Sequence, residues 1–442
     1  MSLLDDEEIY RLNAFDWESE FSEIMKKGGF DAVIGNPPYG FHQIHENFVK
    51  PYFKKKFVSS SGSFEHYFLF YEKSLKLLKR NGLHGFIVPV TWLTIPSAQS
   101  LRKMILDNYW IKEICWLPEL VFENAQVNTL VSIIQYSSNN KNVAIKIYDT
   151  LGFQNPAKRE RNSKQSNFIN SDYYIAIFEG SQDSKVIQKI NSLSIPLKDI
   201  AKPCSGYNPY EVGKGQAPKG GPQTIETVKT KPYHSEENIG DEWRPKIIGR
   251  NLDRYHVNVT QKRWIKYGPW LAAPRDPENF KGKRILVQEI TGGKKKRIVA
   301  AYYENELYYS RDVIPVKIAN KFPHPFYLLS IINSLFISWY HLKRNPKAQK
   351  GLSPKVLVSD LKKLPIPNPV INSIEFKTQH DHMVLLVTKI MDLKKQMYDA
   401  KLSHIKTTIQ RQIESTDKQI DQLVYKLYKL TDEEIKIVES ET

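Results

Sequence analysis

The segment Asn36-Pro37-Pro38-Tyr39 carries the residue types needed to activate an amine attached to an aromatic ring. The lone pair of such a nitrogen is delocalised into the ring, so the nitrogen is a poor nucleophile. The side-chain oxygen of Asn36 and the carbonyl oxygen of Pro37 could accept hydrogen bonds from the two N–H groups of the amine, which would favour a tetrahedral nitrogen. Pro37 and Pro38 stiffen the loop, and Tyr39 offers a flat face for stacking. The alternative is an ordinary Asn-Pro turn.

Strands and helices must position this loop. The apolar run 30–35 is predicted to be a short buried strand, which Asn-Pro-Pro terminates. Apolar residues at helical spacing predict a helix over 66–79, and a strand over 85–90 follows it. Further elements are expected as a helix around 98–108 and strands near 111–116, 130–136 and 144–148. Such alternation predicts an α/β sheet whose ligands gather beyond the carboxyl ends of its strands.

Changes in composition predict three parts. Residues 1–178 are expected to form the α/β part, and residues 179–372 a mixed, mostly β domain, because short apolar runs there alternate with Gly and Pro. One longer helical period covers 327–342 within that domain. Residues 373–442 are expected to form helices that pack on it, with an amphipathic pattern that includes Ile405, Ile409, Ile413, Ile420, Leu423, Val424 and Leu427. Thr431 and Glu434 form a capping-box pattern.

The balance of charge is strongly basic. Sixty-four Lys and Arg against 48 Asp and Glu give a net charge of +16, which suits a polyanion such as nucleic acid, although a merely basic protein is an equal interpretation. No apolar run is long enough for a membrane span, and the N-terminal residues are acidic rather than leader-like. Cys115 and Cys204 show no paired-ligand spacing, so we expect no metal site and a cytoplasmic location.

Basic residues are interleaved with aromatic ones in the middle of the chain. Cations can neutralise phosphates, and planar groups can contact base edges. Each cation taken singly could equally be a solvated surface charge. The DNA-contacting residues predicted from this pattern are Arg244, Lys246, Arg250, Arg254, Lys294, Lys295, Lys296, Arg297, Lys343 and Arg344.

Residues 30–40, Phe-Asp-Ala-Val-Ile-Gly-Asn-Pro-Pro-Tyr-Gly, resemble the catalytic motif of amino-group DNA methyltransferases, in which the adenine-N6 enzymes usually carry Asn. Residues 85–93 and 121–129 resemble later motifs of that family, in the expected order. The region from about 185 to 370 is similar to the target-recognition domain of TaqI-like and Eco57I-like restriction-modification methyltransferases. Its resemblance rests on Gly206-Tyr207-Asn208-Pro209, residues 244–252 and residues 361–367.

The resemblance implies a truncated Rossmann-like methyltransferase sheet, S-adenosylmethionine as methyl donor, and double-stranded DNA as partner. It implies that Asn36 and Pro37 polarise the N6 amine of a flipped adenine, and that Tyr39 and Phe122 sandwich the base, although Phe122 could instead be a core residue. The residues that the resemblance places at the cofactor are Asn13, Asp16, Asn36 and Pro38.

One part of the family pattern is missing. The glycine-rich turn that holds the methionine part of the cofactor should lie upstream, but only 35 residues precede Asn36. We therefore expect 1–178 to be a partial catalytic domain. Two alternatives stay open: a DNA-binding specificity fragment that is inactive on its own, and methylation of a protein glutamine. A fused or associated endonuclease could lie upstream of Met1.

Overall fold

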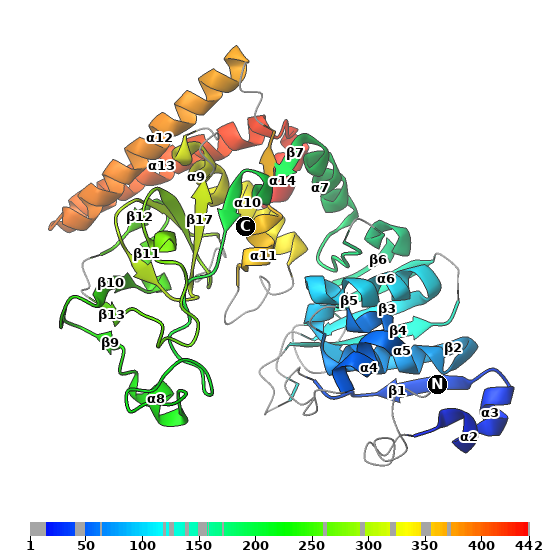
Figure 1. Cartoon of the computed structure of the whole chain (residues 1–442). Coiled ribbons are helices and arrows are strands. Elements are labelled where there is room, and N and C mark those ends of the chain that lie inside the picture. The colour runs from blue at the N-terminus through cyan, green and yellow to red at the C-terminus, as the bar shows by residue number, and fades with distance from the viewer. Residues whose placement is uncertain are drawn as a thin grey trace. The chain divides into compact units, whose positions relative to one another are not determined.

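A computed structural model of the chain provides the structure. It describes residues 15–39, 49–61, 64–117, 121–122, 128–137, 141–148, 157, 159–169, 172–259, 263–291, 297–318, 324–345, 355–368 and 373–440. The chain divides into two compact units, Met1–Ser181 and Gln182–Thr442 (Figure 1).

The first unit is built on a six-stranded sheet with the strand order β1-β2-β4-β3-β5-β6. β1 is parallel to β2, and β3 is parallel to β5, whereas β4 is antiparallel to both β2 and β3 and β6 is antiparallel to β5. Most strands therefore share one direction, which confirms the predicted α/β sheet. The strands are β1 (Phe30–Gly35), β2 (Leu78–Pro89), β3 (Trp110–Leu117), β4 (Thr129–Gln135), β5 (Asn142–Ile147) and β6 (Arg159–Lys164).

Helices α5 and α6 supply much of the core of this unit, together with the buried side chains of the sheet. In α5 the residues Tyr67, Phe68, Tyr71 and Leu75 are buried because they recur at three- and four-residue steps. The helices and 3₁₀ turns of the unit are α2 (Trp17–Glu20), α3 (Ser22–Lys26), α4 (Val49–Lys56), η1 (Val58–Ser60), α5 (His66–Lys76), η2 (Val90–Leu93), η3 (Pro96–Ala98), α6 (Gln99–Asn108) and η4 (Gln165–Phe168).

The second unit is rich in short strands, as the sequence predicts. Its two larger sheets have four strands each, in the orders β16-β10-β13-β9 and β15-β14-β17-β8, and β11-β12 and β18-β7 form two-stranded pairs. The strands are β7 (Ser194–Pro196), β8 (Ala201–Pro203), β9 (His234–Ser235), β10 (Trp243–Ile247), β11 (Leu252–Asp253), β12 (His256–Val257), β13 (Trp264–Lys266), β14 (Arg284–Gln288), β15 (Ala300–Tyr303), β16 (Tyr308–Tyr309), β17 (Val313–Ile318) and β18 (Pro365–Pro367).

The helical period predicted over 327–342 forms two helices rather than one. Ser334 has an extended backbone, and its side chain accepts a hydrogen bond from Ile337 N, so it ends one helix and caps the next. The helices and turns of the unit are α7 (Ser181–Leu193), η5 (Leu197–Asp199), α8 (Ile225–Thr230), η6 (Gly249–Asn251), η7 (Pro277–Phe280), α9 (Pro325–Asn333), α10 (Leu335–Arg344), α11 (Val358–Lys362), α12 (Ile374–Asp399), α13 (Ser403–Leu427) and α14 (Asp432–Glu439).

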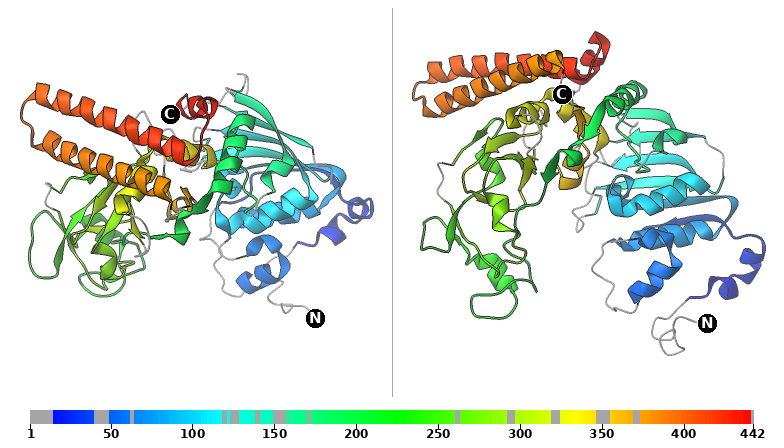
Figure 2. Two further views of the ribbon diagram at one scale, coloured as in Figure 1. Left: turned by 90° about the horizontal axis from the view of Figure 1, so that it is seen from above. Right: turned by 45° about the horizontal axis from the view of Figure 1, so that its top comes forward.

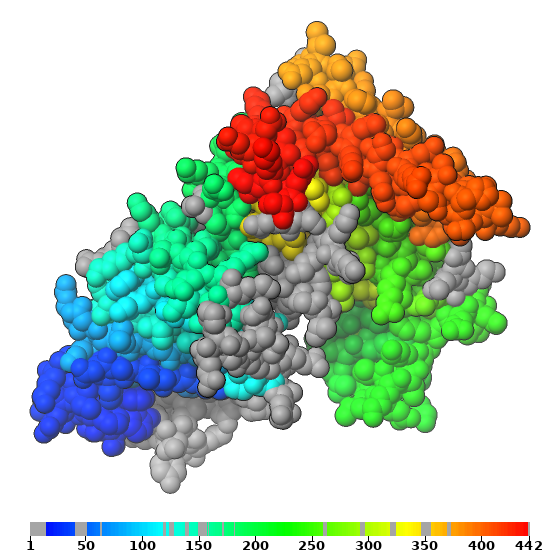
Figure 3. All heavy atoms as spheres, turned by 180° about the vertical axis from the view of Figure 1, so that it is seen from behind, coloured from blue at the N-terminus to red at the C-terminus, as the bar shows by residue number. Residues whose placement is uncertain are grey.

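The C-terminal helices confirm the amphipathic pattern of the tail. α12 and α13 lie side by side as a long pair (Figure 2). They share one hydrophobic core with α9, α10 and the β14-β17 sheet, and Figure 3 shows α12–α14 along one side of the second unit. Ile409, Ile413 and Ile420 are buried, whereas Ile405 is 39% exposed. Thr431 and Glu434 form the predicted capping box at the start of α14.

Candidate active site and nucleic-acid interface

The Asn36 loop begins where β1 ends beside β2. Gly35 pairs with Phe86, and a side chain at position 35 would place its Cβ 2.9 Å from the Phe86 ring, so glycine lets the two strands approach. Asn36 and Pro38 are exposed and Pro37 is buried. The buried proline therefore anchors the loop, while Asn36 is exposed at the carboxyl end of β1.

Tyr39 is fixed by contacts to three other segments. Its hydroxyl donates to the carbonyl oxygen of Ile87 at 3.1 Å, and burial raises the pKa of Tyr39 to about 12, so the phenol stays protonated. Its ring centroid lies 6.2 Å from that of Tyr67 and 6.3 Å from that of Phe122, at interplanar angles of 77° and 68°. The structure thus brings Tyr39 and Phe122 together from distant parts of the sequence.

A buried layer of tyrosines supports Tyr39. Tyr67 is 1% exposed, and its hydroxyl lies 3.5 Å from Thr91 Oγ1. Tyr71, one turn later in α5, has its hydroxyl 2.6 Å from Ser132 Oγ. Burial raises the pKa of both tyrosines. Tyr67 lies in the segment that helical spacing predicted as a helix, and that spacing gives no sign that the residue contacts the Asn36 loop.

Of the two residues before β1 that were predicted to bind the cofactor, Asn13 and Asp16, the structure describes only Asp16. Asn13 lies outside the described residues. Asp16 is exposed and caps α2, where its side chain accepts hydrogen bonds from Glu18 N at 3.0 Å and Ser19 N at 3.4 Å. The rings of Phe15 and Trp17 flank it, and Trp17 packs edge-on against Phe30 of β1 with centroids 5.9 Å apart. These aromatic contacts tie the segment to the first strand.

Metal-binding clusters and membrane-spanning helices are both absent from the described residues. Those residues contain no group of three His, Cys, Asp or Glu side chains arranged to hold a metal ion. None of the helices that the structure describes is long and apolar enough to cross a membrane. Cys115 and Cys204 are free thiols, and the Cys115 thiol donates to Glu113 at 2.9 Å.

Two of the cations predicted to contact DNA are accessible in the second unit. Arg250 is exposed in η6. The side chain of Arg244 on β10 is 38% exposed, lies 3.6 Å from the carboxylate of Glu306, and donates to the backbone carbonyl of Asp241. β10 leads directly into η6, so both arginines belong to one stretch of chain.

Three of the predicted cations are structural, which corrects the prediction that they contact DNA. Arg254 donates through both terminal nitrogens to Asp417, at 2.6 Å each. Arg297 donates to Asp417 at 3.2 Å and to Asp421 at 3.3 Å. Lys343 is 4% exposed and lies 2.7 Å from Asp183. A buried cation that already pairs with a carboxylate cannot neutralise a phosphate without breaking that pair.

The remaining predicted cations are less accessible or outside the described part. Lys246 is 7% exposed, with its ammonium 3.1 Å from His234 Nε2. Burial, with Arg263 and Lys231 nearby, lowers the pKa of Lys246 to about 8. Arg344 is half-buried, 6.0 Å from the centre of the Tyr340 ring. Lys294, Lys295 and Lys296 lie outside the described residues.

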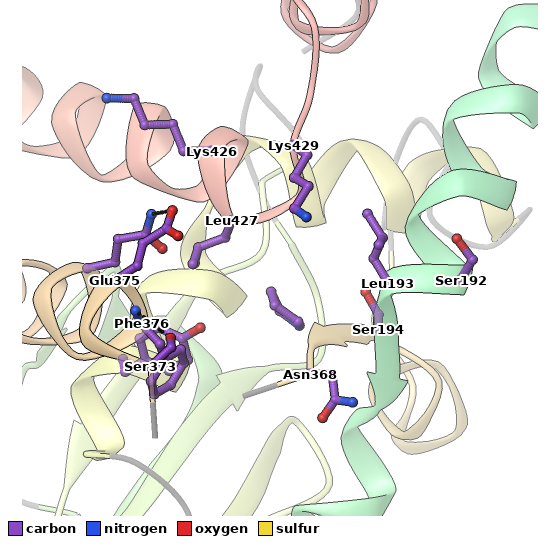
Figure 4. Close-up of a pocket in the computed structure, with 13 residues that line it drawn as sticks. Ser192, Leu193, Ser194, Asn368, Ser373, Glu375, Phe376, Lys426, Leu427 and Lys429 are labelled. Atoms are coloured by element: carbon purple, nitrogen blue, oxygen red, sulfur yellow. Dashed lines mark hydrogen bonds between the residues drawn. The ribbon is translucent and has the colours of Figure 1, made fainter. Parts of the chain in front are cut away.

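A pocket of about 430 Å³ lies elsewhere in the second unit (Figure 4). Its walls come from the end of α7, from β18, from the start of α12 and from the end of α13, and include Ser194, Asn368, Phe376 and Lys429. None of the predicted site residues that the structure describes lines it. The pocket is a gap between packed helices and the β7-β18 strand pair, and the predicted chemistry does not depend on it.

Comparisons with known families match both parts of the chain. Residues 2–122 match the model of the Eco57I restriction-modification methylase, and residues 244–366 match that of the TaqI-like C-terminal specificity domain. A Methanocaldococcus jannaschii protein assigned as a type II restriction enzyme and methyltransferase is 25% identical over 96% of this chain and 33% of its own length. The Thermus thermophilus type II methyltransferase M.TthHB8I is 33% identical over 26% of this chain and 28% of its own length.

The chain therefore spans about a third or less of the length of these curated relatives. Among solved structures, the type IIL restriction-modification enzyme MmeI in complex with DNA matches 97% of this chain and 58% of its own, with a TM-score of 0.61 and 11% identity. At that identity the match supports the fold alone. The two matched families and the sequence relatives agree: the chain carries an Eco57I-like restriction-modification methylase region and a TaqI-like C-terminal specificity domain, and it is similar to type II methyltransferases.

Proposed function

We propose that the chain carries the catalytic loop and the DNA-specificity domain of a site-specific DNA methyltransferase that methylates N6 of adenine in duplex DNA. The observation that supports this proposal best is the exposed Asn36 at the carboxyl end of β1, next to the pair of rings formed by Tyr39 and Phe122. The name of one relative, the adenine-specific methyltransferase BrxX of Escherichia coli, agrees with adenine as the target.

The chemistry assigned to the loop is polarisation of the target amine. Asn36 Oδ1 and the Pro37 carbonyl oxygen accept hydrogen bonds from the two N–H groups of N6. These hydrogen bonds localise the nitrogen lone pair for attack on an electrophile. As N6 bonds to the methyl carbon, the C–S bond of the donor would break and a neutral thioether would leave. The cationic amine would then release one proton to solvent. Asn36 stays neutral throughout, because its role is to accept hydrogen bonds and not to remove the proton.

S-adenosylmethionine supplies an electrophilic methyl group when it is bound. The described residues offer part of a site for it: Asn36 and Pro38 are exposed, and the preceding segment adds the exposed carboxylate of Asp16 and the 56% exposed ring of Phe15. These groups suit the hydrogen-bonding and stacking needs of an adenosine moiety. We therefore propose that they hold the adenosine end of the donor.

The aromatic pair is assigned to the extruded base. An adenine between two parallel rings needs a ring-to-ring separation of roughly 7 Å, which is twice the ~3.5 Å contact distance. The rings of Tyr39 and Phe122 are 6.3 Å apart and tilted by 68°. Tyr39 is held by its hydrogen bond to Ile87, so we propose that Phe122 reorients when the base enters.

DNA is proposed to bind the second unit through its accessible cations. The net charge of +16 favours a polyanion, and Arg244 and Arg250 are exposed enough to reach phosphates. A second candidate function is a recognition module that binds DNA but transfers no methyl group by itself. It is favoured by the match of residues 244–366 to the TaqI-like C-terminal specificity domain. Because relatives also carry the name restriction enzyme, we propose that an endonuclease can accompany the methyltransferase.

The test is transfer of tritium from labelled S-adenosylmethionine to mixed-sequence duplex DNA. The chain is assayed beside a version that includes any native residues upstream of Met1, and each is compared with its Asn36→Ala variant. We expect Asn36→Ala to abolish labelling while the affinity for DNA stays within a few-fold. Equal labelling by the variant would refute the role of Asn36. DNA binding without labelling by either parent would support the recognition module.

A further inference from the structure

The partly exposed carboxylate of Glu211 in the second unit interacts with the side chains of Asn208, Arg311 and Lys214. Glu211 Oε2 accepts a hydrogen bond from Asn208 Nδ2 at 2.9 Å, and Arg311 Nη2 lies 4.0 Å from the same oxygen. Lys214 Nζ lies 2.5 Å from Glu211 Oε1. The side chains of Glu211 and Arg311 are 37% and 54% exposed. The hydrogen bond from Lys214 lowers the pKa of Glu211, with Arg311 adding to the effect, so Glu211 is an anion at neutral pH.

The backbone beneath Asn208 and Glu211 is held on several sides. A side chain at Gly206 would place its Cβ 2.1 Å from the carbonyl oxygen of Ser310, so only glycine allows this crossing of the two segments. Asn208 N and O each form a 2.9 Å hydrogen bond with Ala273. Gln223 is 1% exposed and accepts from Glu211 N at 2.9 Å. The motif Gly206-Tyr207-Asn208-Pro209 thus provides a rigid platform.

The loop that carries Arg311 is equally well fixed. Asp312 accepts hydrogen bonds from Ser310 Oγ at 2.7 Å and from Gly249 N at 2.5 Å. The second bond joins this loop to η6, which carries the exposed Arg250. Arg311 and Arg250 therefore lie on neighbouring loops, and a phosphate contact by Arg250 would bring DNA close to the Glu211 cluster.

We propose that Asn208, Glu211 and Arg311 are specificity-determining residues that contact base edges in the major groove of duplex DNA. This inference rests on the proposed DNA-methyltransferase function. Arg pairs with guanine O6 and N7, Asn with adenine N6 and N7, and a carboxylate accepts from cytosine N4. In the absence of DNA the three side chains satisfy one another, and surface contacts of this kind are weak enough to exchange for base contacts.

The platform explains why exposed side chains can discriminate between bases. A flexible side chain on a mobile loop would lose conformational freedom on each contact, whereas these side chains start from a backbone that is already ordered. Gln223 contributes to that order with two further bonds, because its Nε2 donates to the carbonyl oxygens of Pro209 and Trp270 at 3.0 Å each.

The test is selection of binding sites by the 442-residue chain from a pool of random-sequence duplexes, followed by sequencing. We expect Glu211→Gln and Arg311→Lys each to lose at least about fivefold of base discrimination at one or two positions of the selected site. Arg311→Lys keeps the positive charge but not the two-pronged geometry, so it should retain overall affinity. Lys219→Gln, an exposed position on the same loop, is the matched control and should select the unchanged site.

The outcomes separate this inference from the function on which it rests. If the wild-type chain binds no duplex DNA, the proposed function fails and the inference falls with it. If the wild type selects a site and both variants select the same site with the same discrimination, DNA recognition stands and the inference is wrong. All three substituted side chains are exposed or partly exposed, so each variant should unfold at the same temperature as the wild type. Thermal unfolding of each variant checks this.

Discussion

Replacing Asp417 by Asn should destabilise the second unit without a direct effect on DNA contacts. Asp417 accepts two hydrogen bonds from Arg254 at 2.6 Å, one from Arg297 at 3.2 Å and one from the hydroxyl of Tyr255 at 3.2 Å. Asn has the same shape but no charge, so two largely buried guanidinium groups lose their shared anion.

The size of the effect follows from what remains after the substitution. Removing one partner of a buried ion pair costs about 3–5 kcal/mol. Both arginines keep a hydrogen bond to the carbonyl oxygen of Asn333, and Arg297 keeps Asp421. We therefore expect the lower end, about 3 kcal/mol, which corresponds to a decrease in Tm of roughly 6 °C for a unit of this size.

The pH dependence of the loss has a definite sign. Burial alone would raise the pKa of Asp417, but Arg254 and Arg297 outweigh burial and leave the pKa below its ordinary value. A depressed carboxylate pKa stabilises the fold above the unfolded value of ~4, and the stabilisation disappears as the pH falls through the folded pKa. The difference between wild type and Asp417→Asn should therefore shrink below about pH 4.

Unfolding in urea is monitored by far-UV circular dichroism, and DNA binding is measured in parallel as a function of salt concentration. Asp421→Asn is the control, because burial raises the pKa of Asp421, and loss of its charge should therefore cost less, about 1 kcal/mol. A loss of less than 1 kcal/mol in Asp417→Asn would refute the account of the cluster. So would an Arg254→Met variant whose stability is unchanged but whose salt dependence of DNA binding is reduced.

Three further substitutions probe the site and the interface. Arg250→Ala should leave stability within about 0.5 kcal/mol and lower the slope of log affinity against log salt by about 1, as measured by fluorescence anisotropy; an unchanged slope would argue against a phosphate contact. Phe122→Ala should reduce the fluorescence increase of a 2-aminopurine placed at the target adenine, because the extruded base loses one stacking ring, and an unaltered signal would count against the sandwich. Lys246→Met should remove a pH-dependent part of the free energy of unfolding, because the folded pKa of Lys246 is lowered to about 8. Wild-type stability should therefore rise relative to the variant by about 2 kcal/mol between pH 7.5 and 9.5. A difference in stability that does not change with pH would contradict that pKa.

The sequence placed the Asn36 loop correctly because the controlling features are local. An apolar strand followed by Asn-Pro-Pro cannot continue, and β1 does end at Gly35. The prediction that this strand is buried is wrong, because β1 is an edge strand of the sheet and none of its residues is buried. The capping box at Thr431 is local in the same way. Patterns of this kind depend on neighbouring residues, so they are visible without knowledge of the fold.

The cations were misassigned because burial is not local. Arg254 and Arg297 resemble other exposed basic residues in sequence, yet their partner is Asp417, far along the chain in α13. The amphipathic pattern of α13 does not show that Asp417 and Asp421 face inward with the isoleucines. Glu211 was missed for the related reason that its neighbour Arg311 comes from a distant loop.

Identification of the methylated nucleoside tests the central claim most directly. Duplex DNA is incubated with S-adenosylmethionine and the enzyme, digested to nucleosides and analysed by mass spectrometry, with Asn36→Ala treated in parallel. We expect N6-methyladenine from the wild type and none from the variant. Methylcytosine in place of N6-methyladenine, or no methylated nucleoside at all, would contradict N6-adenine methylation.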